Sequence, residues 1–291
     1  GAATAIASGG PGSIFWMWVS AFFGMATIYA EAVMAQHTRK LENGHYVGGP
    51  VYYIKYVFKG RFGKFLAGFF SVAIILALGF MGNMVQSNSI SDAFYTAFSV
   101  PKWVMGVIVA VLAAFIFIGG ISRIASFTEK VVPVMAALYL VGALVVILIN
   151  IQHVPSAIAS IFICAFRPDA VFGAAAGITV RKAMRYGVAR GLFSNEAGMG
   201  STPHAHARAK AESPHHQGLC AMVSVFIDTF IVLNLTVFSV LTTGVMSTGK
   251  DGTALTQTAF MKGFGSAGII FVAVCLFFFA FSTILSWNLF G

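Results

Sequence analysis

The sequence has few charged residues, and acidic ones are the scarcest. Charged side chains make up 9% of the 291 residues, with 9 Asp and Glu against 18 Lys and Arg. Because soluble domains carry about 25% charged residues, this shortage excludes an ordinary water-soluble protein. Hydrophobic residues reach 58%, and the mean hydropathy is +0.86. With about 20 residues per crossing, the chain has room for about seven or eight spans. We expect residues 1–291 to form a single all-α integral membrane domain.

Cysteine is scarce as well, which excludes a disulfide framework and a thiolate metal site. The three cysteines, Cys164, Cys220 and Cys275, are isolated in or beside apolar runs. We also expect no metal at the histidines, which lie in two loosely spaced pairs without a thiolate partner: His204, His206, His215 and His216. The sequence contains no recognisable nucleophile–base pair, metal motif or carboxylate dyad. We therefore expect neither an enzyme nor an organic cofactor.

The basic residues, which give a formal net charge of +9, lie in the connections between apolar runs. There they indicate membrane topology rather than nucleic-acid binding. Six of them fall within residues 37–64, which places that connection in the cytoplasm of a multi-pass plasma (inner) membrane protein. For residues 157–189 we expect an outer loop with a short helix. The apolar runs predict membrane spans at about residues 15–36, 65–98, 101–120, 131–150, 219–245 and 268–290.

Two glycine-rich segments interrupt this apolar pattern. Gly9-Gly10-Pro11-Gly12 lies near the start, and residues 190–201 place small residues, amides and a carboxylate between apolar stretches. Irregular backbone at membrane depth must be buried in protein or line a wet cavity. In secondary transporters, paired broken helices of this kind form the substrate and ion site. We therefore predict a discontinuous span around residues 187–207.

Several motifs resemble those of the sodium:alanine (alanine/glycine:cation) symporter family. They are GGPGSIFWMW at 9–18, GGPVYYI at 48–54, GNMVQSN at 82–88, RGLFSNEAGMGSTP at 190–203 and FIDT at 226–229. The resemblance implies a leucine-transporter-like inverted-repeat helical bundle with unwound first and sixth helices. On that template the chain is an internal fragment, from the outer half of helix one through helix eight. The implied activity is symport of alanine or glycine across the lipid bilayer, with sodium as the coupling ion.

Three amides, Asn83, Gln86 and Asn88, lie in the middle of the long span over residues 65–98. Polar groups at this depth are costly unless they pair or bind something. Asn83 and Gln86 are three residues apart, and we expect them to share a helix face. We predict that the cluster contacts the substrate, although helix–helix hydrogen bonding would also account for any single amide.

The second interrupted segment supplies further candidates. Phe193, Ser194 and Asn195 fall at the predicted break, where freed carbonyls and side-chain oxygens can meet a substrate ammonium group or sodium. A packing kink is the alternative, because Gly198 and Gly200 permit close helix approach.

By the resemblance, Thr283 and Trp287 of the last span face the substrate, and Ser282 with Thr283 completes a sodium site. Hydroxyl and carbonyl oxygens suit sodium. The alternative is that each hydroxyl bonds a carbonyl of its own helix, which is common for a lone Ser or Thr.

Three carboxylates, Glu31, Glu196 and Asp228, are expensive at membrane depth. Each is a candidate ion ligand, proton site or half of a buried pair. We expect structural pairing for Glu31 and Asp228, and for Glu196 a pair with Arg190 is as plausible as ion coupling. Proton-coupled symport through these residues is therefore the main alternative. A passive channel is disfavoured because the polar residues cluster at the midplane rather than forming a continuous path.

Overall fold

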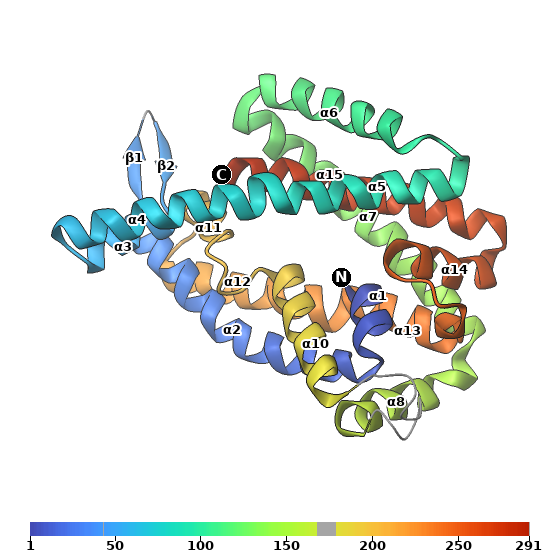
Figure 1. The fold of residues 1–291 in the computed structure, drawn as a ribbon. Helices are drawn as coiled ribbons and strands as arrows, with labels where there is room; N and C mark the ends of the chain where they lie inside the picture. Colours follow the sequence, from blue (N-terminus) through green and yellow to red (C-terminus); the bar gives the residue numbers. More distant parts are fainter. Residues whose placement is uncertain (43, 168–178, 291) are drawn as a thin grey trace.

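The chain is almost entirely helical, as its composition predicts. A computed structural model describes residues 1–42, 44–167 and 179–290 (Figure 1). Five helical stretches among the described residues are long and apolar enough to cross a membrane: Gly12–Thr38, Gly60–Phe98, Arg123–Ile149, Pro214–Thr242 and Ser266–Asn288. They coincide with five of the six predicted spans. The sixth, over residues 101–120, is a shorter apolar helix, Lys102–Ile118. An all-α multi-pass membrane protein is therefore confirmed.

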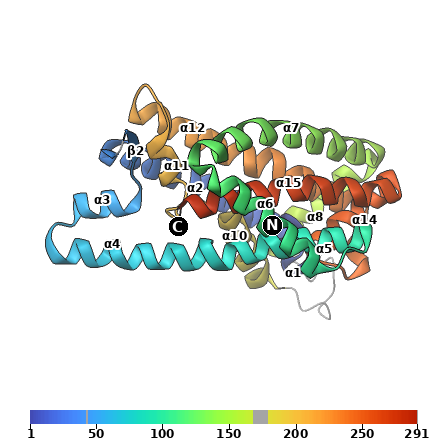
Figure 2. The same cartoon turned by 90° about the horizontal axis from the view of Figure 1, so that it is seen from above.

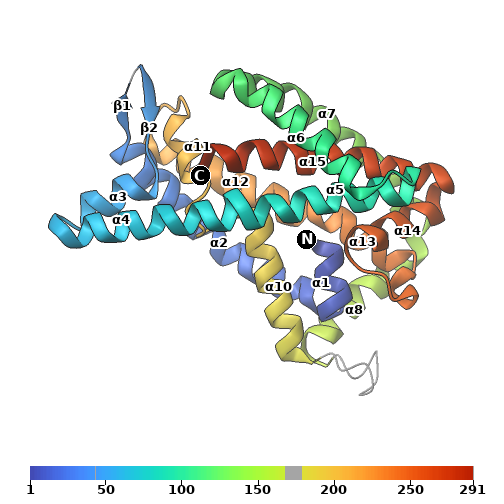
Figure 3. The ribbon, with the colours of Figure 1, turned by 45° about the horizontal axis from the view of Figure 1, so that its top comes forward.

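The helices form two layers (Figures 1 and 3). In the first layer α5 packs along α15, with α6 and α7 beside them. In the second layer α2 packs against α8, α10 and α12, and α1 packs against α10 and α13. The bounds of these helices are α1 Ala2–Gly9, α2 Gly12–Thr38, α5 Asn83–Phe98, α6 Lys102–Ile118, α7 Gly120–Ile149, α8 Val154–Phe166, α10 Val180–Asn195, α12 Pro214–Phe226, α13 Asn234–Thr242 and α15 Ser266–Phe290.

Shorter elements connect the layers. A hairpin follows α2, with Leu41 of its first strand opposite Tyr46 of its second. The α3 and α4 helices lie next to each other, and their connection forms the far end of the molecule (Figure 2). The bounds are β1 Lys40–Glu42, β2 His45–Val47, α3 Pro50–Val57, α4 Gly60–Ile74, η2 Ile151–His153, α11 Pro203–Arg208, η5 Val245–Thr248 and α14 Gly252–Phe264.

The first glycine-rich segment makes the turn between α1 and α2. Gly10 has φ 73°, a left-handed conformation that a side chain disfavours. Gly12 faces α8 so closely that a Cβ atom would lie 2.3 Å from the carbonyl oxygen of Cys164. Only glycine fits at this contact. The GGPG sequence therefore serves helix packing as well as the turn.

Two membrane spans contain a π-helical segment. The stretch η1 (Ile75–Gly82) continues α4 into α5, and η4 (Ile227–Leu233) joins α12 to α13. A π segment widens the helix locally and leaves backbone groups poorly paired, and such segments are frequent at functional sites. Neither π-helical segment was predicted from the sequence.

The predicted interruption around residues 187–207 is confirmed. The α10 helix ends at Asn195, and the chain then turns through left-handed conformations at Glu196 (φ 56°), Gly198 (φ 84°) and Gly200 (φ 74°) before α11. We refer to residues 196–202 as the break loop. Of the expected outer loop over residues 157–189, α8 occupies the start and α10 the end, while residues 168–178 lie outside the described residues.

Candidate functional site

A cavity of about 720 Å³ lies between the two layers. Its walls come from α5 and α15 on one side, and from α1, α10 and the η4–α13 span on the other. The start of α14 closes one end. Eight of the residues singled out in the sequence line it: Gln86, Asn88, Phe193, Ser194, Glu196, Asp228, Thr283 and Trp287. The structure thus brings together residues that are as far apart in the chain as Gln86 and Trp287.

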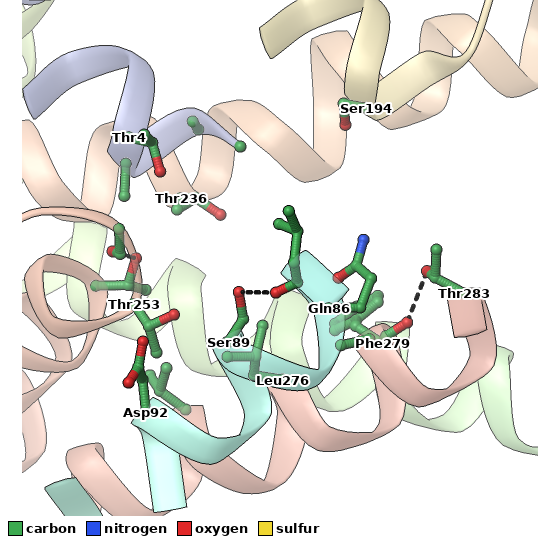
Figure 4. A pocket seen from close by; sticks show the side chains of 18 of the residues that line it. Thr4, Gln86, Ser89, Asp92, Ser194, Thr236, Thr253, Leu276, Phe279 and Thr283 are labelled. Carbon is green, nitrogen blue, oxygen red and sulfur yellow. Dashed lines mark hydrogen bonds between the residues drawn. The ribbon is translucent and has the colours of Figure 1, made fainter. Parts of the chain in front are cut away.

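The first layer presents an amide and hydroxyls to the cavity. Figure 4 shows Gln86 and Ser89 of α5 beside Thr283 of α15, with Ser194 across the opening. The Thr283 hydroxyl donates to the Phe279 carbonyl at 2.9 Å, as the alternative interpretation holds, while its oxygen still borders the cavity. Ser282 also donates to its own helix and is buried outside the cavity lining.

The end of α10 is joined to η4 through side chains. Ser194 Oγ donates to Asp228 Oδ2 at 2.9 Å, and both residues line the cavity. Asn195 points away from it. Its Nδ2 donates to Thr229 Oγ1 at 3.3 Å, and its Oδ1 accepts the Ala197 amide at 3.1 Å. The Asn195 amide is thus engaged within the fold, whereas Ser194 and Asp228 offer oxygens to the cavity.

Glu196 links the break loop to the opposite layer. Its Oε1 accepts a hydrogen bond from Trp287 Nε1 at 2.6 Å, and its Oε2 accepts one from Ser201 Oγ. Arg190 also lines the cavity, but no ion pair joins it to Glu196 in the part of the chain that the structure describes. Of the two alternatives for Glu196, the pair with Arg190 does not form, and two neutral donors hold the carboxylate instead.

The Trp287 side chain forms part of the cavity wall. It is among the largest buried side chains, and its ring meets Phe193 edge-on with centroids 5.5 Å apart. Gly82 lies against the indole on the other side, where a Cβ atom would be 2.4 Å from Cζ3 of Trp287. The indole is thus held between η1 and the end of α10, and its N–H is already occupied by Glu196.

Glu31 lies outside the cavity lining and supports the break loop from α2. Its two carboxylate oxygens accept the backbone amides of Gly198 at 3.0 Å and Gly200 at 3.1 Å. The expected structural pairing therefore takes the form of backbone hydrogen bonds rather than an ion pair. The sequence could not reveal this, because the donors are main-chain groups 167 and 169 residues away.

Asn83 does not share the cavity with Gln86. Its Nδ2 donates to the Gly79 carbonyl at 3.1 Å, and its Oδ1 is buried without a described partner. Asn83 borders a second pocket, beside Trp103 of α6, and Asn88 borders both pockets. Residues three apart on a helix differ by about 60° in direction. Gln86 therefore borders the cavity and Asn83 borders the pocket beside α6, so the two residues do not share the expected face.

Several lining residues went unrecognised in the sequence. Lys102 pairs with Asp92 at 2.5 Å near the end that α14 closes. Tyr139 shares a hydrogen bond of 2.5 Å with Thr236, which joins α7 to α13 beside the cavity. The Asp92–Lys102 spacing spans a helix end and a turn, so periodicity gave no signal. The Tyr139–Thr236 contact joins segments 97 residues apart.

Membrane-length helices around a polar cavity beside a broken helix define a multi-pass membrane transport protein. The chain belongs to the sodium:alanine symporter family, whose family model matches residues 1–291. It is 41% identical to the sodium/alanine symporter AgcS of Methanococcus maripaludis, over 100% of this chain and 64% of that protein. It is 40% identical to the putative sodium/proton-dependent alanine carrier protein YrbD of Bacillus subtilis, over 99% and 61%.

A third relative, the probable sodium/glutamine symporter GlnT of Bacillus subtilis, is 38% identical over 100% of this chain and 60% of its own length. The chain thus spans 60–64% of the length of these three relatives. Membership of a family of transporters agrees with the expectation of a non-enzymatic protein.

Proposed function

We propose that the protein is a sodium-coupled symporter that moves a small neutral amino acid, alanine or glycine, inward by alternating access across the plasma membrane. The two-layer arrangement around a central cavity supports a leucine-transporter-like bundle that forms one transport domain. The observation that carries the proposal is the Ser194–Asp228 pair, 2.9 Å apart, where the broken helix meets the cavity. In such transporters the unwound carbonyls and the C-terminal ends of broken helices coordinate the cation. The Ser194 hydroxyl and the Asp228 carboxylate add oxygen ligands at the C-terminal end of α10.

The substrate is a zwitterion and needs partners of both kinds. We assign its ammonium group to the carboxylate side of the cavity, near Ser194 and Asp228. We assign its carboxylate to the donors Gln86 and Asn88 on α5, which line the opposite wall. Asn88 Nδ2 already donates one hydrogen bond to Asp92 Oδ2 at 3.0 Å, so its second N–H is the one assigned to the substrate. Phe193 and Trp287 pack against each other in the cavity wall and limit the space for the side chain of the substrate. Asn83 and Asn195 contribute by holding their helices, since their amides bond within the protein.

Sodium is assigned to oxygen ligands at the same break. Asp228 and Ser194 offer a carboxylate and a hydroxyl, and Thr283 offers a hydroxyl on the facing helix. Ser282, which is buried outside the cavity lining, is not assigned to this site. When substrate and ion both stabilise the closed cavity, the sodium gradient drives uptake through the coupling free energy between the two sites. Proton coupling through Asp228 or Glu196 is the second candidate, because both carboxylates line the cavity without a described ion-pair partner.

Uptake by the complete polypeptide in proteoliposomes tests both candidates. With equal pH on the two sides, an inward sodium gradient should drive accumulation of labelled alanine and glycine. Uptake driven by a pH gradient in potassium buffer alone would overturn sodium coupling. Excess glutamine serves as competitor, and its preferential uptake would overturn the assignment of a small substrate.

The Asp228→Asn variant tests the cation-binding end of the cavity, to which both the substrate ammonium group and sodium are assigned. It should abolish sodium-dependent uptake, because the amide keeps a hydrogen-bond partner for Ser194 but removes the charge. Asp251→Asn is the matched control, since Asp251 lines the cavity at its other end. If the two variants transport equally well, the cation site is elsewhere.

A further inference from the structure

The connection between α3 and α4 carries a basic surface that the proposed transport cycle does not use. Four cations lie within ten residues and all are solvent-exposed: Lys55, Lys59, Arg61 and Lys64. None of them forms an ion pair among the residues that the structure describes. The nearby carboxylate of Glu42 instead accepts the Tyr52 hydroxyl at 3.3 Å. We refer to residues 55–65 as the basic elbow.

The elbow has a defined shape. Gly60 adopts φ 78°, which permits the sharp turn into α4. Gly63 passes so close to the chain that a Cβ atom would lie 1.6 Å from the Phe58 carbonyl oxygen. These two glycines fold α3 back along α4 and bring Lys55 to the same end of the molecule as the cations that begin α4 (Figure 2). The clustering of charge is therefore built into the backbone.

Like charges at this position need a counter-charge. The α4 helix begins with Arg61 and Lys64 in or next to its first turn, and it has no acidic residue there and no side-chain cap. The N-terminus of a helix is already positive, so basic residues at this position are unfavourable on their own. An anion bound at the elbow would offset both effects.

The aromatic residues around the elbow indicate where that anion lies. Phe62, Phe65 and Phe69 are strongly exposed along α4, which continues into the apolar membrane span Gly60–Phe98. Exposed Tyr56 and Phe58 extend this surface onto the elbow. Tyr is enriched at the membrane–water interface, and surfaces that lie in the interface combine Lys and Arg with apolar residues such as Phe. The cations therefore stand at headgroup level, where the apolar surface ends.

We propose that the basic elbow binds the phosphate groups of anionic phospholipids. The four cations supply the charge, and the aromatic side chains hold the elbow at the depth of the headgroups. Clusters of basic residues next to a membrane span attract anionic lipid, each contributing about 1 kcal/mol near the surface. The proposal is independent of the coupling ion, because it uses no residue of the cavity.

Quenching by brominated lipids tests this proposal on the complete protein. A tryptophan is placed at the elbow in the Phe62→Trp variant, and at mid-membrane in the matched Phe23→Trp variant. The two phenylalanines have similar exposed fractions, 60% and 67%. Each variant is reconstituted in phosphatidylcholine vesicles that contain one tenth brominated phosphatidylglycerol or, separately, one tenth brominated phosphatidylcholine. The signal of the native tryptophans is subtracted with the unsubstituted protein.

The result is the ratio of quenching by the anionic lipid to quenching by the zwitterionic lipid. We expect at least about a threefold ratio at position 62, given the attraction per basic residue, and a ratio near one at position 23. Equal ratios at the two positions would overturn the proposal. Because bromine depth is the same in both lipids, the ratio does not depend on how deeply each tryptophan lies.

Neutralising the elbow separates a specific surface from general charge. Changing Lys55, Lys59, Arg61 and Lys64 to Gln should bring the ratio at position 62 to about one. Changing Arg181, Lys182 and Arg185 of α10 to Gln should leave it unchanged. An equal loss in both variants would refute a dedicated surface. Salt provides a second test that leaves the four cations unchanged. The quenching ratio at position 62 should fall toward one at 1 M salt, where the Debye screening length is about 3 Å. A ratio that does not depend on salt would also refute the proposal.

Discussion

Gly82 allows a direct test of how Trp287 packs in the cavity wall, because the absence of a side chain at residue 82 makes room for the indole. In Gly82→Ala the new Cβ atom would lie 2.4 Å from Cζ3 and 2.7 Å from Cε3 of the indole. Overpacking a filled site costs about 1–3 kcal/mol. The matched control is Gly79→Ala in the same π segment, where the nearest atom would be 3.8 Å away. Gly79→Ala should instead raise the free energy of unfolding by up to about 1 kcal/mol, because alanine lowers the backbone entropy of the unfolded chain.

The two variants are compared by their melting temperatures in detergent. For a chain of this size 1 kcal/mol corresponds to about 2–4 °C. The two variants should differ by about 1–4 kcal/mol, so Gly82→Ala should melt about 2–16 °C below Gly79→Ala. Combining Gly82→Ala with Trp287→Leu should cost less than the sum of the two single changes, because the clash depends on the indole. Equal stability of the two alanine variants, or strict additivity in the double variant, would refute the packing of Trp287 against η1.

Two further predictions concern the break loop and the turn between α1 and α2. Glu31→Gln should destabilise the break loop by about 1–2 kcal/mol, because Gln keeps one acceptor oxygen and places an NH2 donor where the second backbone amide needs an acceptor. Amide hydrogen exchange at those two residues checks this, and unchanged protection would contradict it. Gly12→Ala should prevent stable folding, since its Cβ would meet rigid backbone at 2.3 Å, and a normal yield of monodisperse protein would contradict it.

Hydropathy and glycine placement predicted the spans and the broken helix, because both follow from local requirements of a chain in hydrocarbon. A span needs an uninterrupted apolar run, and a break needs residues that tolerate left-handed backbone. Gly198 and Gly200 meet that requirement. Side-chain direction was less predictable. Asn83 and Gln86 point to different sides of α5. Which side meets the cavity depends on the rotation of α5 about its own axis against α6 and α15, and the sequence of α5 alone does not determine this rotation.

Partnerships between distant segments were the least predictable part of the site. Glu31 and Glu196 were recognised as costly carboxylates, but their partners are backbone amides and an indole on other elements. A main-chain donor has no sequence signature. The Trp287 indole was expected to face the substrate. Its hydrogen bond to Glu196 depends on the packing of α15 beside the end of α10, which the sequence does not specify.

The break loop is where hydrogen bonds from several elements meet. Glu31 holds it to α2, and Glu196 holds it to Trp287 of α15 in the other layer. Just before it, Ser194 binds Asp228 of η4. Because Glu196 directly follows α10, any movement of α15 away from α10 must break the Glu196–Trp287 hydrogen bond or carry the loop with it. A ligand bound at Ser194 and Asp228 lies at the last residues of the same helix. Its binding free energy can therefore alter the contact between the layers without a separate signalling path.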